Sequence, residues 1–415
     1  MKNVLFLLHE YYPEPSAITN CITPIINKFK KDGVNVDVIT RRSSFKLLKS
    51  ENINGVYVYR VNSNLELIDE KCKQSRNFVS NFIYRIIRKI LYINYIKFKT
   101  NQFGLLNFYS AYILGKKLLK KNKYDVIVSC SYPFTTHKIA RRLREKSNCV
   151  WIAYQLDPHT YNYTFETKNT KKRLAEEISI LKSADVIFLG EENYNYNLKT
   201  PLKALKDKYI PLDYALIKDN VCICKKEKTS IHLVYTGTFY DNIREPYEML
   251  KFLELSDLDF QFDIYFNCDI DMKNKIELFQ RNNNRINFFY KKSKSECDNA
   301  IRNADIIVNV GNTIPNQLPS KVYEAISTGK PIINFYTIEE DTSMQLLKKY
   351  PLCINLKLPS NDIRLFDDFC KTNYNKNISA MEIFELYKTS DLISSEFVKV
   401  AKDCYESKQN KKKLI

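Results

Sequence analysis

The sequence predicts an α/β protein with two doubly wound parallel sheets, and three observations lead to this fold class. The 415 residues exceed the usual size of one domain, so two domains are expected. Short apolar runs rich in β-branched residues alternate with helical patterns along most of the chain, which is typical of parallel sheets covered by helices. A hydrophobic content of 44%, with only 13 Pro and 8 Gly, is sufficient for packed cores and argues against disorder.

The first half of the chain contains six apolar runs that we expect to be strands. They are Val4–Leu8, Val34–Thr40, Val56–Val61, Asp125–Ser129, Cys149–Tyr154 and Asp185–Gly190. Helical patterns separate most of them, at Ile18–Phe29, Thr136–Lys146 and Lys171–Leu181. Because crossovers between parallel strands are right-handed, this order predicts a Rossmann-like domain over residues 1–208.

The second half repeats the pattern over residues 209–385. Its expected strands are Ile231–Thr236, Phe262–Phe266, Ile286–Tyr290, Ile306–Val310 and Pro331–Phe335, and Pro246–Glu254 is the helix between the first two. The region near residues 209–229, which contains the segment Ile210-Pro211-Leu212, is expected to link the two domains. In the last segment, residues 386–415, a helix over Ser394–Ser407 precedes a lysine-rich tail.

One βα unit in the second half carries the clearest candidate for a ligand site. The sequence NTIPNQLPSKVYEAISTGKPIINF, residues 312–335, leaves a predicted strand and passes through a helix into the next one. Ligands bind at loops that leave the carboxyl ends of parallel strands. Lys321 and Glu324 lie three residues apart on one helical face, after the capping hydroxyl of Ser320. The cation and the carboxylate could hold a phosphate and a sugar hydroxyl; the alternative is an ordinary surface ion pair.

A second loop of the same predicted sheet follows the strand Ile231–Thr236. Gly237 would let the backbone approach a diphosphate, Thr238 would donate a hydroxyl hydrogen bond, and Arg244 could clamp phosphate oxygens. The alternative is a simple tight turn at the glycine. Because both loops leave the carboxyl ends of one parallel sheet, they are expected to converge.

Two loops of the first half carry candidate residues for binding an acceptor, that is, a second substrate with a reacting hydroxyl. Tyr132 and His137 lie at a strand-to-helix turn, and Asp157 and His159 follow the next strand. Asp157 or His159 could orient an acceptor hydroxyl or take its proton. The alternative is capping and turn chemistry, since Asp-Pro is a common turn pair and His137 could serve only in packing.

These motifs resemble those of the GT-B glycosyltransferases of the large retaining family that builds bacterial surface polysaccharides. The resemblance covers nearly the whole chain, and its most specific part is LPSKVYEAISTGKPII, residues 318–333, which is similar to the family's donor-site helix. It implies two Rossmann-like domains facing each other across a cleft, with a C-terminal helix that crosses back to the N-terminal domain. It also implies sugar transfer from a nucleotide-diphosphate sugar by front-side attack, with retention of configuration.

The resemblance assigns roles to residues of the donor side. It implies that Glu324 binds ribose hydroxyls and that Ser320 and Lys321 lie beside the donor phosphates. Gly237 and Arg244 align with the glycine and the cation that hold the diphosphate in the family. Arg244 and Lys321 would then assist the leaving group.

Two departures from the family pattern concern the donor sugar and the acceptor. Asn316 stands where the family often has a glutamate, and an amide can bond sugar hydroxyls but adds no charge. Pro15, Ser16 and Ala17 replace a pair of glycines in the first loop of the N-terminal half, which places Ser16 on the acceptor side.

No metal or other cofactor is expected to be obligatory. The eleven cysteines include no C-x-x-C pair and no histidine partner, so neither a zinc site nor a disulfide framework is indicated. In the resembled architecture, cations and helix N-termini support the leaving diphosphate in place of an obligatory Mg²⁺. No pair of acids placed for glycoside hydrolysis is visible, which disfavours a hydrolase.

The net charge of +18 is unevenly distributed, because residues 71–124 contain thirteen Lys or Arg and no Asp or Glu. Aromatic and isoleucine residues are interleaved with these cations over residues 77–99. A basic, aromatic-rich amphipathic helix is attracted by an anionic membrane surface. Nucleic acid is a competing partner, but no nucleic-acid-binding motif accompanies the patch. The remaining alternative is a solvated helix that packs its Ile and Tyr face internally.

These features predict a cytoplasmic, peripheral enzyme at the inner face of the cell membrane, since there is neither a signal peptide nor an apolar run long enough to span a bilayer. It would transfer a sugar to a lipid-linked or glycan acceptor in the synthesis of capsule, O-antigen or a similar polysaccharide. Two alternatives stay open: a GT-B epimerase of nucleotide sugars, and a catalytically silent GT-B binding subunit, for which Asn316 is the argument.

Overall fold

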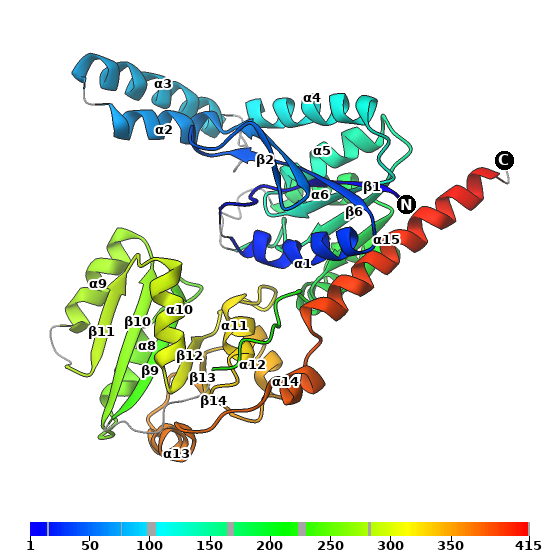
Figure 1. Ribbon diagram of the computed structural model, residues 1–415. Coiled ribbons are helices and arrows are strands. Elements are labelled where there is room, and N and C mark those ends of the chain that lie inside the picture. Colours follow the sequence, from blue (N-terminus) through cyan, green and yellow to red (C-terminus); the bar gives the residue numbers. More distant parts are fainter. Residues whose placement is uncertain are drawn as a thin grey trace. The chain divides into compact units, whose positions relative to one another are not determined.

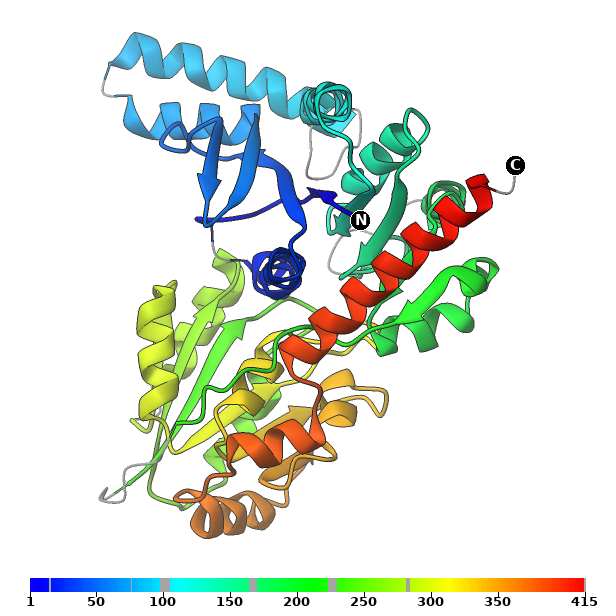
Figure 2. The ribbon, with the colours of Figure 1, turned by 45° about the vertical axis from the view of Figure 1, so that its right-hand side comes forward.

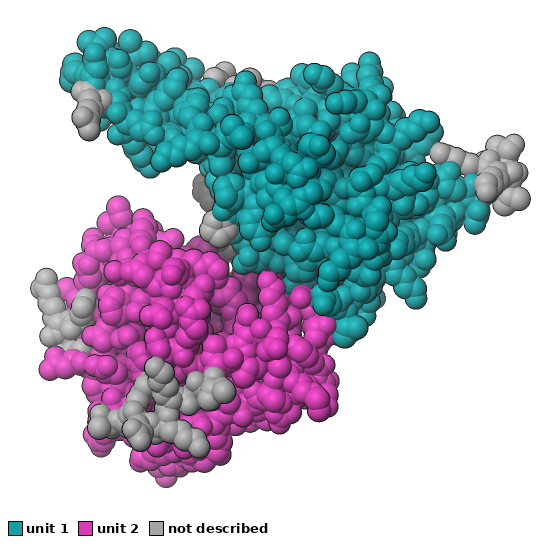
Figure 3. Space-filling view, in the orientation of Figure 1, with its two compact units in different colours: residues 1–162, 167–215, 391–415 teal, residues 163–166, 216–390 magenta. Residues whose placement is uncertain are grey.

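The computed structural model describes residues 1–14, 16–75, 77–97, 105–163, 170–222, 230–280 and 284–413. Two compact units make up the chain (Figure 3). Unit 1 comprises residues 1–162, 167–215 and 391–415, and unit 2 comprises residues 163–166 and 216–390. The chain therefore leaves unit 1, builds unit 2 and returns to unit 1 with its C-terminal segment.

Unit 1 is built on a sheet with eight strands among the described residues (Figure 1). They are β1 (Asn3–Leu7), β2 (Asn35–Arg42), β3 (Ser50–Ile53), β4 (Val56–Asn62), β5 (Val126–Ser131), β6 (Val150–Gln155), β7 (Val186–Leu189) and β8 (Tyr209–Pro211). Their spatial order is β3-β4-β2-β1-β5-β6-β7-β8, and every pair is parallel except β3 with β4. The strand order thus reverses between β1 and β5.

The six strands predicted in this half are present, and two short edge strands were not foreseen. β3 pairs with β4 in a hairpin whose turn places Asn54 and Gly55 at positive φ. β8 extends the sheet beside β7. β8 therefore occupies the start of the predicted linker region, 209–229, and the change of unit comes after Ala215, within that region. A strand of three residues is too short to show a periodicity in the sequence.

Helices cover both faces of this sheet. One face carries α4 (Leu105–Lys121), α5 (Thr135–Arg144) and α6 (Thr170–Leu181), whose apolar residues pack on one set of alternating strand residues. The other face carries α1 (Ala17–Lys31) and α15 (Ser390–Lys413). The further helical segments of unit 1 are α2 (Asn64–Gln74), α3 (Phe78–Lys97), α7 (Glu191–Leu198) and the 3₁₀ helix η1 (Pro201–Lys208).

The C-terminal helix α15 packs on unit 1 through a buried aromatic side chain. The ring of Phe397 lies 4.5 Å from that of Phe188, 5.6 Å from that of Tyr154 and 6.2 Å from that of Phe29, centroid to centroid. These partners come from β7, β6 and α1, so α15 is part of the N-terminal core. This return to the N-terminal domain is the one that the resemblance implied.

The predicted basic stretch divides into two helices with different surroundings. α4 belongs to the core, where Ala111 and Leu118 are buried. α3 lies beside α2, and the two project from the body of unit 1 (Figures 1 and 2). Lys99 lies outside the described residues, as does the side chain of Lys97.

Unit 2 is built on a fully parallel sheet with six strands in the described part of the chain. They are β9 (Ile231–Thr238), β10 (Phe260–Asn267), β11 (Ile286–Tyr290), β12 (Ile306–Val310), β13 (Ile332–Tyr336) and β14 (Cys353–Lys357), in the order β11-β10-β9-β12-β13-β14. The helices are α8 (Tyr247–Glu254), α9 (Ile270–Gln280), α10 (Lys294–Asn303), α11 (Lys321–Ser327), α12 (Thr342–Leu347), α13 (Arg364–Asn373) and α14 (Ala380–Leu386). The prediction of two doubly wound sheets is confirmed.

Two kinds of feature are absent from the described residues. No helix there combines the length and the apolar character needed to cross a membrane. No three or more His, Cys, Asp or Glu side chains are grouped there so that they could hold a metal ion.

Candidate functional site

In unit 2 the strand order reverses between β9 and β12, and open parallel sheets bind ligands at such a switch point. Arg244, from the loop after β9, donates from Nε and Nη2 to Oδ1 of Asn312, from the loop after β12, over 3.1 and 2.8 Å. Its Nη1 donates to the carbonyl oxygen of Thr238 over 3.2 Å. The two loops therefore converge, and Arg244 joins them.

Asn312 is held by a buried carboxylate that the sequence analysis missed. Asp341 accepts from the backbone N–H of Asn312 over 2.9 Å and from that of Met344 over 2.6 Å. Burial raises the pKa of Asp341 to about 6, although these hydrogen bonds and the charge of Arg244 act in the opposite direction. Gly311 leaves room for this carboxylate, since a Cβ atom there would lie 2.2 Å from its Oδ2. Asp341 follows β13, so the rule about carboxyl ends could have pointed to it.

Gly237 is explained by packing inside unit 2. β9 extends to Thr238, so Gly237 lies in the strand and not in the loop where it was predicted. A Cβ atom at Gly237 would come within 2.4 Å of the Tyr235 hydroxyl oxygen. Tyr235 in turn stacks on Phe239, with 4.8 Å between ring centroids. The neighbouring ring thus requires the glycine, and an approach of a diphosphate to its backbone stays a prediction.

The first turn of α11 presents the predicted cation and carboxylate. Lys321 Nζ donates to Oε2 of Glu324 over 2.7 Å, and the two side chains are 37% and 31% exposed. Ser320 precedes the helix without a side-chain capping bond. Burial lowers the pKa of Lys294 on α10, but the charges of Glu324 and Asp298 outweigh it and raise that pKa above its usual value. The ion pair between Lys321 and Glu324, which the sequence left as an alternative, is thus formed, and both partners are accessible.

A cavity of about 580 Å³ opens beside Arg244 in unit 2. Its wall combines the polar groups of Arg244 and Thr313 with the rings of Tyr247, Phe279 and Phe335. This volume is within the usual range for small-molecule sites. Asn316, in contrast, is fully buried and offers no surface to a sugar. The predicted contact of Asn316 with the donor sugar thus gains no support from its position.

In unit 1 the switch point lies between β1 and β5, and the loops after β1 and β5 begin there. Ser16 caps α1, because its Oγ accepts from the backbone N–H of Thr19 over 3.1 Å. Tyr132, after β5, is partly exposed. The Ser131 hydroxyl donates to the carbonyl oxygen of Asp157 over 2.9 Å, which ties the loop after β6 to the end of β5. Tyr132 and Asp157 therefore lie on neighbouring loops, and Ser16 has a local structural role.

His137 is a core residue. It is fully buried, and its Nδ1 lies 2.7 Å from the hydroxyl oxygen of Ser129, which accepts from the indole N–H of Trp151 over 2.8 Å. Burial, together with the neighbouring His159, lowers the pKa of His137 to about 3. This position matches the packing alternative and not an acceptor contact.

His159 is anchored within unit 1. It stacks on Phe134 with 4.0 Å between ring centroids, and its Nε2 lies 3.6 Å from Oε2 of Glu176. Burial acts to raise the pKa of Glu176, but His159 and Lys138 lower it to about 2. The Glu176 carboxylate is thus ionised at neutral pH and holds the imidazole of His159 in place. This favours a structural role for His159 over contact with an acceptor.

Comparisons with known proteins concern the fold. No protein-family model matches the chain, and no curated protein matches it in sequence. Sucrose-phosphate synthase from Thermosynechococcus elongatus superposes with a TM-score of 0.67 at 12% identity, over 98% of this chain and 100% of the other. HepE of Anabaena, solved with UDP and glucose, gives 0.62 at 9% identity, over 97% and 100%. The lipopolysaccharide outer core galactosyltransferase WaaB gives 0.51 at 14% identity, over 98% of each chain.

This chain has the GT-B fold. Both sheets and the returning C-terminal helix lie within the matched length, so the GT-B fold that the resemblance implied is confirmed.

In this GT-B chain the loop after β1 carries a charged cluster that the sequence analysis did not single out. His9 and Glu10 follow β1, and Nη2 of Arg41 lies 2.9 Å from Oε1 of Glu10, while its Nη1 contacts Glu66. Burial and the charge of Arg41 lower the pKa of His9 to about 3, so the imidazole is neutral at physiological pH. Two polar residues directly after the first predicted strand were the available signal. A neutral imidazole can accept a hydrogen bond from a hydroxyl, so His9 joins the acceptor-side candidates.

Proposed function

We propose that this chain transfers a sugar from a nucleotide-diphosphate sugar to a lipid-linked or glycan acceptor, with retention of configuration, in the synthesis of a bacterial surface polysaccharide. The GT-B fold supports the reaction class, because it is shared with glycosyltransferases, among them one solved with UDP and glucose and one of the lipopolysaccharide outer core. The observation that carries the proposal is the junction of Arg244 with Asn312 at the switch point of unit 2.

The donor would bind to unit 2 through cations and hydroxyls. Arg244 and Lys321 would hold the diphosphate, and Glu324 would exchange its ion pair with Lys321 for the ribose hydroxyls. Partly exposed ion pairs contribute less than about 1 kcal/mol, whereas hydrogen bonds from cations to phosphate are stronger. The exchange of partners is therefore favourable. Thr238 and Ser320 would add hydroxyl donors beside the phosphates.

Catalysis would depend on the departure of the nucleoside diphosphate. Negative charge on the leaving oxygens grows toward the transition state, so cations fixed in advance lower the barrier. Arg244 is fixed in this way by Asn312 and Thr238. Asp157 would orient the acceptor hydroxyl and accept its proton. We expect no step that requires a metal or other cofactor.

The test compares donor binding and transfer in matched variants. Nucleotide-diphosphate sugars are first screened by thermal shift, and binding and turnover are then measured with the donor that stabilises the protein most. Arg244→Ala should weaken diphosphate binding about tenfold to a hundredfold, because it removes charge-assisted hydrogen bonds worth ~1.5–3 kcal/mol. Asn312→Ala, which releases the guanidinium and also removes the hydrogen bond from Asn312 Nδ2 to the carbonyl oxygen of Gln317, should weaken it about threefold to tenfold. Arg364→Ala is the control, since Arg364 lies exposed on α13.

Three outcomes would contradict the proposal. Equal nucleotide affinity in wild type and Arg244→Ala would reject the donor site at the switch point. Binding without hydrolysis or transfer to any acceptor would identify a silent binding subunit. Interconversion of the donor sugar without transfer would identify an epimerase.

An anionic membrane surface is the partner that we propose for α3. This helix carries a continuous stripe of exposed apolar residues on the side that does not pack against α2: Phe78, Val79, Phe82, Ile83, Ile86, Ile87 and Ile90. Phe78 is 85% exposed. Contiguous exposed apolar surface marks interaction sites, and a helix with such a stripe is typical of the membrane interface.

The charges beside the stripe favour anionic lipids. Arg85 and Lys89 are exposed, and neither forms an ion pair with another residue that the structure describes. Arg88 is paired with Asp69 and so contributes less. Each unpaired cation contributes about 1 kcal/mol near an anionic leaflet, and apolar burial adds about 25 cal/mol per Å². A nucleic acid would use the cations but would leave the apolar stripe exposed, so the membrane surface fits both features.

A further inference from the structure

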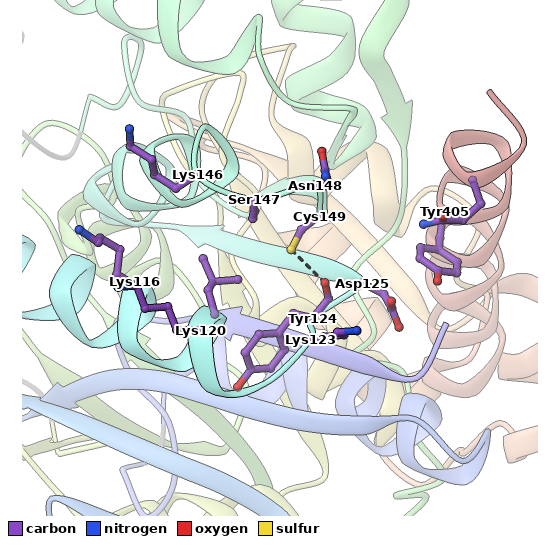
Figure 4. A pocket seen from close by; sticks show the side chains of 12 residues that line it. Lys116, Lys120, Lys123, Tyr124, Asp125, Lys146, Ser147, Asn148, Cys149 and Tyr405 are labelled. Carbon is purple, nitrogen blue, oxygen red and sulfur yellow. Dashed lines mark hydrogen bonds between the residues drawn. The ribbon is translucent and has the colours of Figure 1, made fainter. Parts of the chain in front are cut away.

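A second cavity lies on unit 1. It is at the end of the sheet where the strands begin, opposite to the end that carries the acceptor-side loops. Its volume is about 780 Å³, and it is enclosed by the end of α4, the segment between α5 and β6, and α15 (Figure 4). Asp125 and Cys149, which line it, directly precede β5 and β6. The cavity is therefore at the amino ends of these strands, whereas Tyr132 and Asp157 follow their carboxyl ends. It is therefore distinct from the candidate donor site of unit 2 and from the acceptor-side residues of unit 1.

The lining is strongly basic. Four lysines contribute to it, and Figure 4 shows them on α4, after α4 and after α5: Lys116, Lys120, Lys123 and Lys146. Within the described ranges, none of the four ammonium groups forms an ion pair with a carboxylate. The carboxylate of Asp125 is already engaged, because its Oδ2 accepts from the backbone N–H groups of Lys2 and Asn3 over 2.5 and 3.1 Å.

The negative C-terminal ends of α4 and α5 compensate only part of this positive charge. Lysines are favourable near helix C-termini, where the macrodipole places about half a negative charge. Two helix ends and one carboxylate then supply about two negative charges against four lysines, which leaves an excess of about two positive charges. An anion with two charges would balance it.

We propose that this cavity binds a phosphorylated small molecule. Lysine ammonium groups bind phosphate as point charges, and a phosphate ester carries close to two negative charges at neutral pH. The cavity is larger than an isolated ion requires and falls within the range of small-molecule sites. Leu119 and the rings of Tyr124 and Tyr405 supply apolar wall for the organic part of the ligand. The ligand could be a soluble phosphate ester or the headgroup of a phospholipid, and both share this chemistry.

The experiment uses inorganic pyrophosphate as the probe, in the full-length protein with Arg244→Ala and Lys321→Ala so that the donor loops do not contribute. Lys120→Gln with Lys146→Gln should weaken pyrophosphate binding about fivefold to tenfold in calorimetry, because exposed charges contribute up to about 1 kcal/mol each. The control is Lys203→Gln with Lys206→Gln, which removes the same charge from two exposed positions of η1 in unit 1. Affinity in the control should change less than about twofold.

The same variants decide the outcome and the source of the phosphate. The proposal is overturned if pyrophosphate shows no saturable binding, or if both lysine pairs lower the affinity equally. The vesicle arm adds Phe82→Ser, Ile86→Ser and Ile90→Ser to every variant so that α3 does not contribute. Loss of the remaining binding to phosphatidic acid vesicles in Lys120→Gln with Lys146→Gln, but not in the control, would assign the phosphate to a lipid. Weaker pyrophosphate binding with unchanged vesicle binding would assign it to a soluble compound. Equal melting temperatures of the variants show that the fold is retained.

Discussion

Lys321 and Glu324 occupy the position from which a cation and a carboxylate can exchange partners at low cost. They are bonded to each other over 2.7 Å, yet both keep about a third of their side-chain surface exposed, at 37% and 31%. An i,i+3 pair that water can reach contributes about 0.5 kcal/mol or less. A diphosphate and a ribose would each offer several hydrogen bonds, so the free energy of the pair does not prevent ligand binding.

Glu324→Gln tests which role the carboxylate has. As a ribose ligand, Glu324 accepts hydroxyl hydrogen bonds as an anion, and its neutral amide replacement should weaken nucleotide binding by ~1–3 kcal/mol. The melting temperature should stay nearly unchanged, because the ion pair is accessible to water. Calorimetry and thermal unfolding measure the two quantities. Glu339→Gln is the matched control, since Glu339 forms an exposed ion pair with Lys357. Normal nucleotide affinity with a lower melting temperature would make Glu324 a structural partner of Lys321.

At the scale of elements, the buried strands could be predicted, whereas three of the four edge strands that the structure describes, β3, β8 and β14, could not. Every residue of β5 and β6 is buried, so each appears in the sequence as a mainly apolar run. β3 has exposed and half-buried residues in alternation, and β14 is mostly half-buried, so neither shows such a run. The same limit applies to the site. The spacing of Lys321 and Glu324 is visible in a linear sequence, whereas the contact of Arg244 with Asn312 joins residues 68 positions apart and depends on the strand order.

α3 is the element whose exposed surface makes a quantitative prediction. Phe82→Ser with Ile86→Ser and Ile90→Ser should weaken binding to all vesicles about tenfold or more, since inserted apolar area is lost. Arg85→Gln with Lys89→Gln should weaken binding only to anionic vesicles, about tenfold, and added salt should have the same effect on the wild type. Sedimentation with vesicles of varied anionic lipid content measures both.

The controls for α3 separate a membrane from a protein partner. Leu392→Ser changes an exposed apolar residue on α15 and should leave vesicle binding unchanged. Equal binding of wild type to neutral and anionic vesicles would show that Arg85 and Lys89 do not contribute to binding. A different outcome would be unchanged vesicle binding in Phe82→Ser with Ile86→Ser and Ile90→Ser, together with conversion of a dimer to a monomer in sedimentation velocity. That outcome would show that the stripe is covered by a second copy of the chain.

At the scale of the whole molecule, the path of the chain makes unit 1 dependent on its last segment. Residues 391–415 complete unit 1 after the whole of unit 2 has been built. Phe397 is fully buried there against Phe29, Tyr154 and Phe188, which come from three elements of the first 190 residues. Apart from residues 163–166, unit 2 is one continuous stretch of sequence from Leu216 to Ser390. Loss of the contact at Phe397 should therefore affect the stability of unit 1 alone.

Phe397→Ala should lower the free energy of unfolding of unit 1 by about 3–5 kcal/mol, because it removes a buried aromatic ring and leaves a cavity. The single tryptophan, Trp151, lies in β6 and is buried in unit 1, so its fluorescence during urea unfolding follows this unit. Leu392→Ala, at an exposed position of the same helix, should change the value by less than about 0.5 kcal/mol. Nucleotide binding follows unit 2 and should persist in Phe397→Ala at urea concentrations where the tryptophan signal is already lost. Simultaneous loss of both signals would mean that the two units unfold as one, and the dependence would then belong to the whole chain.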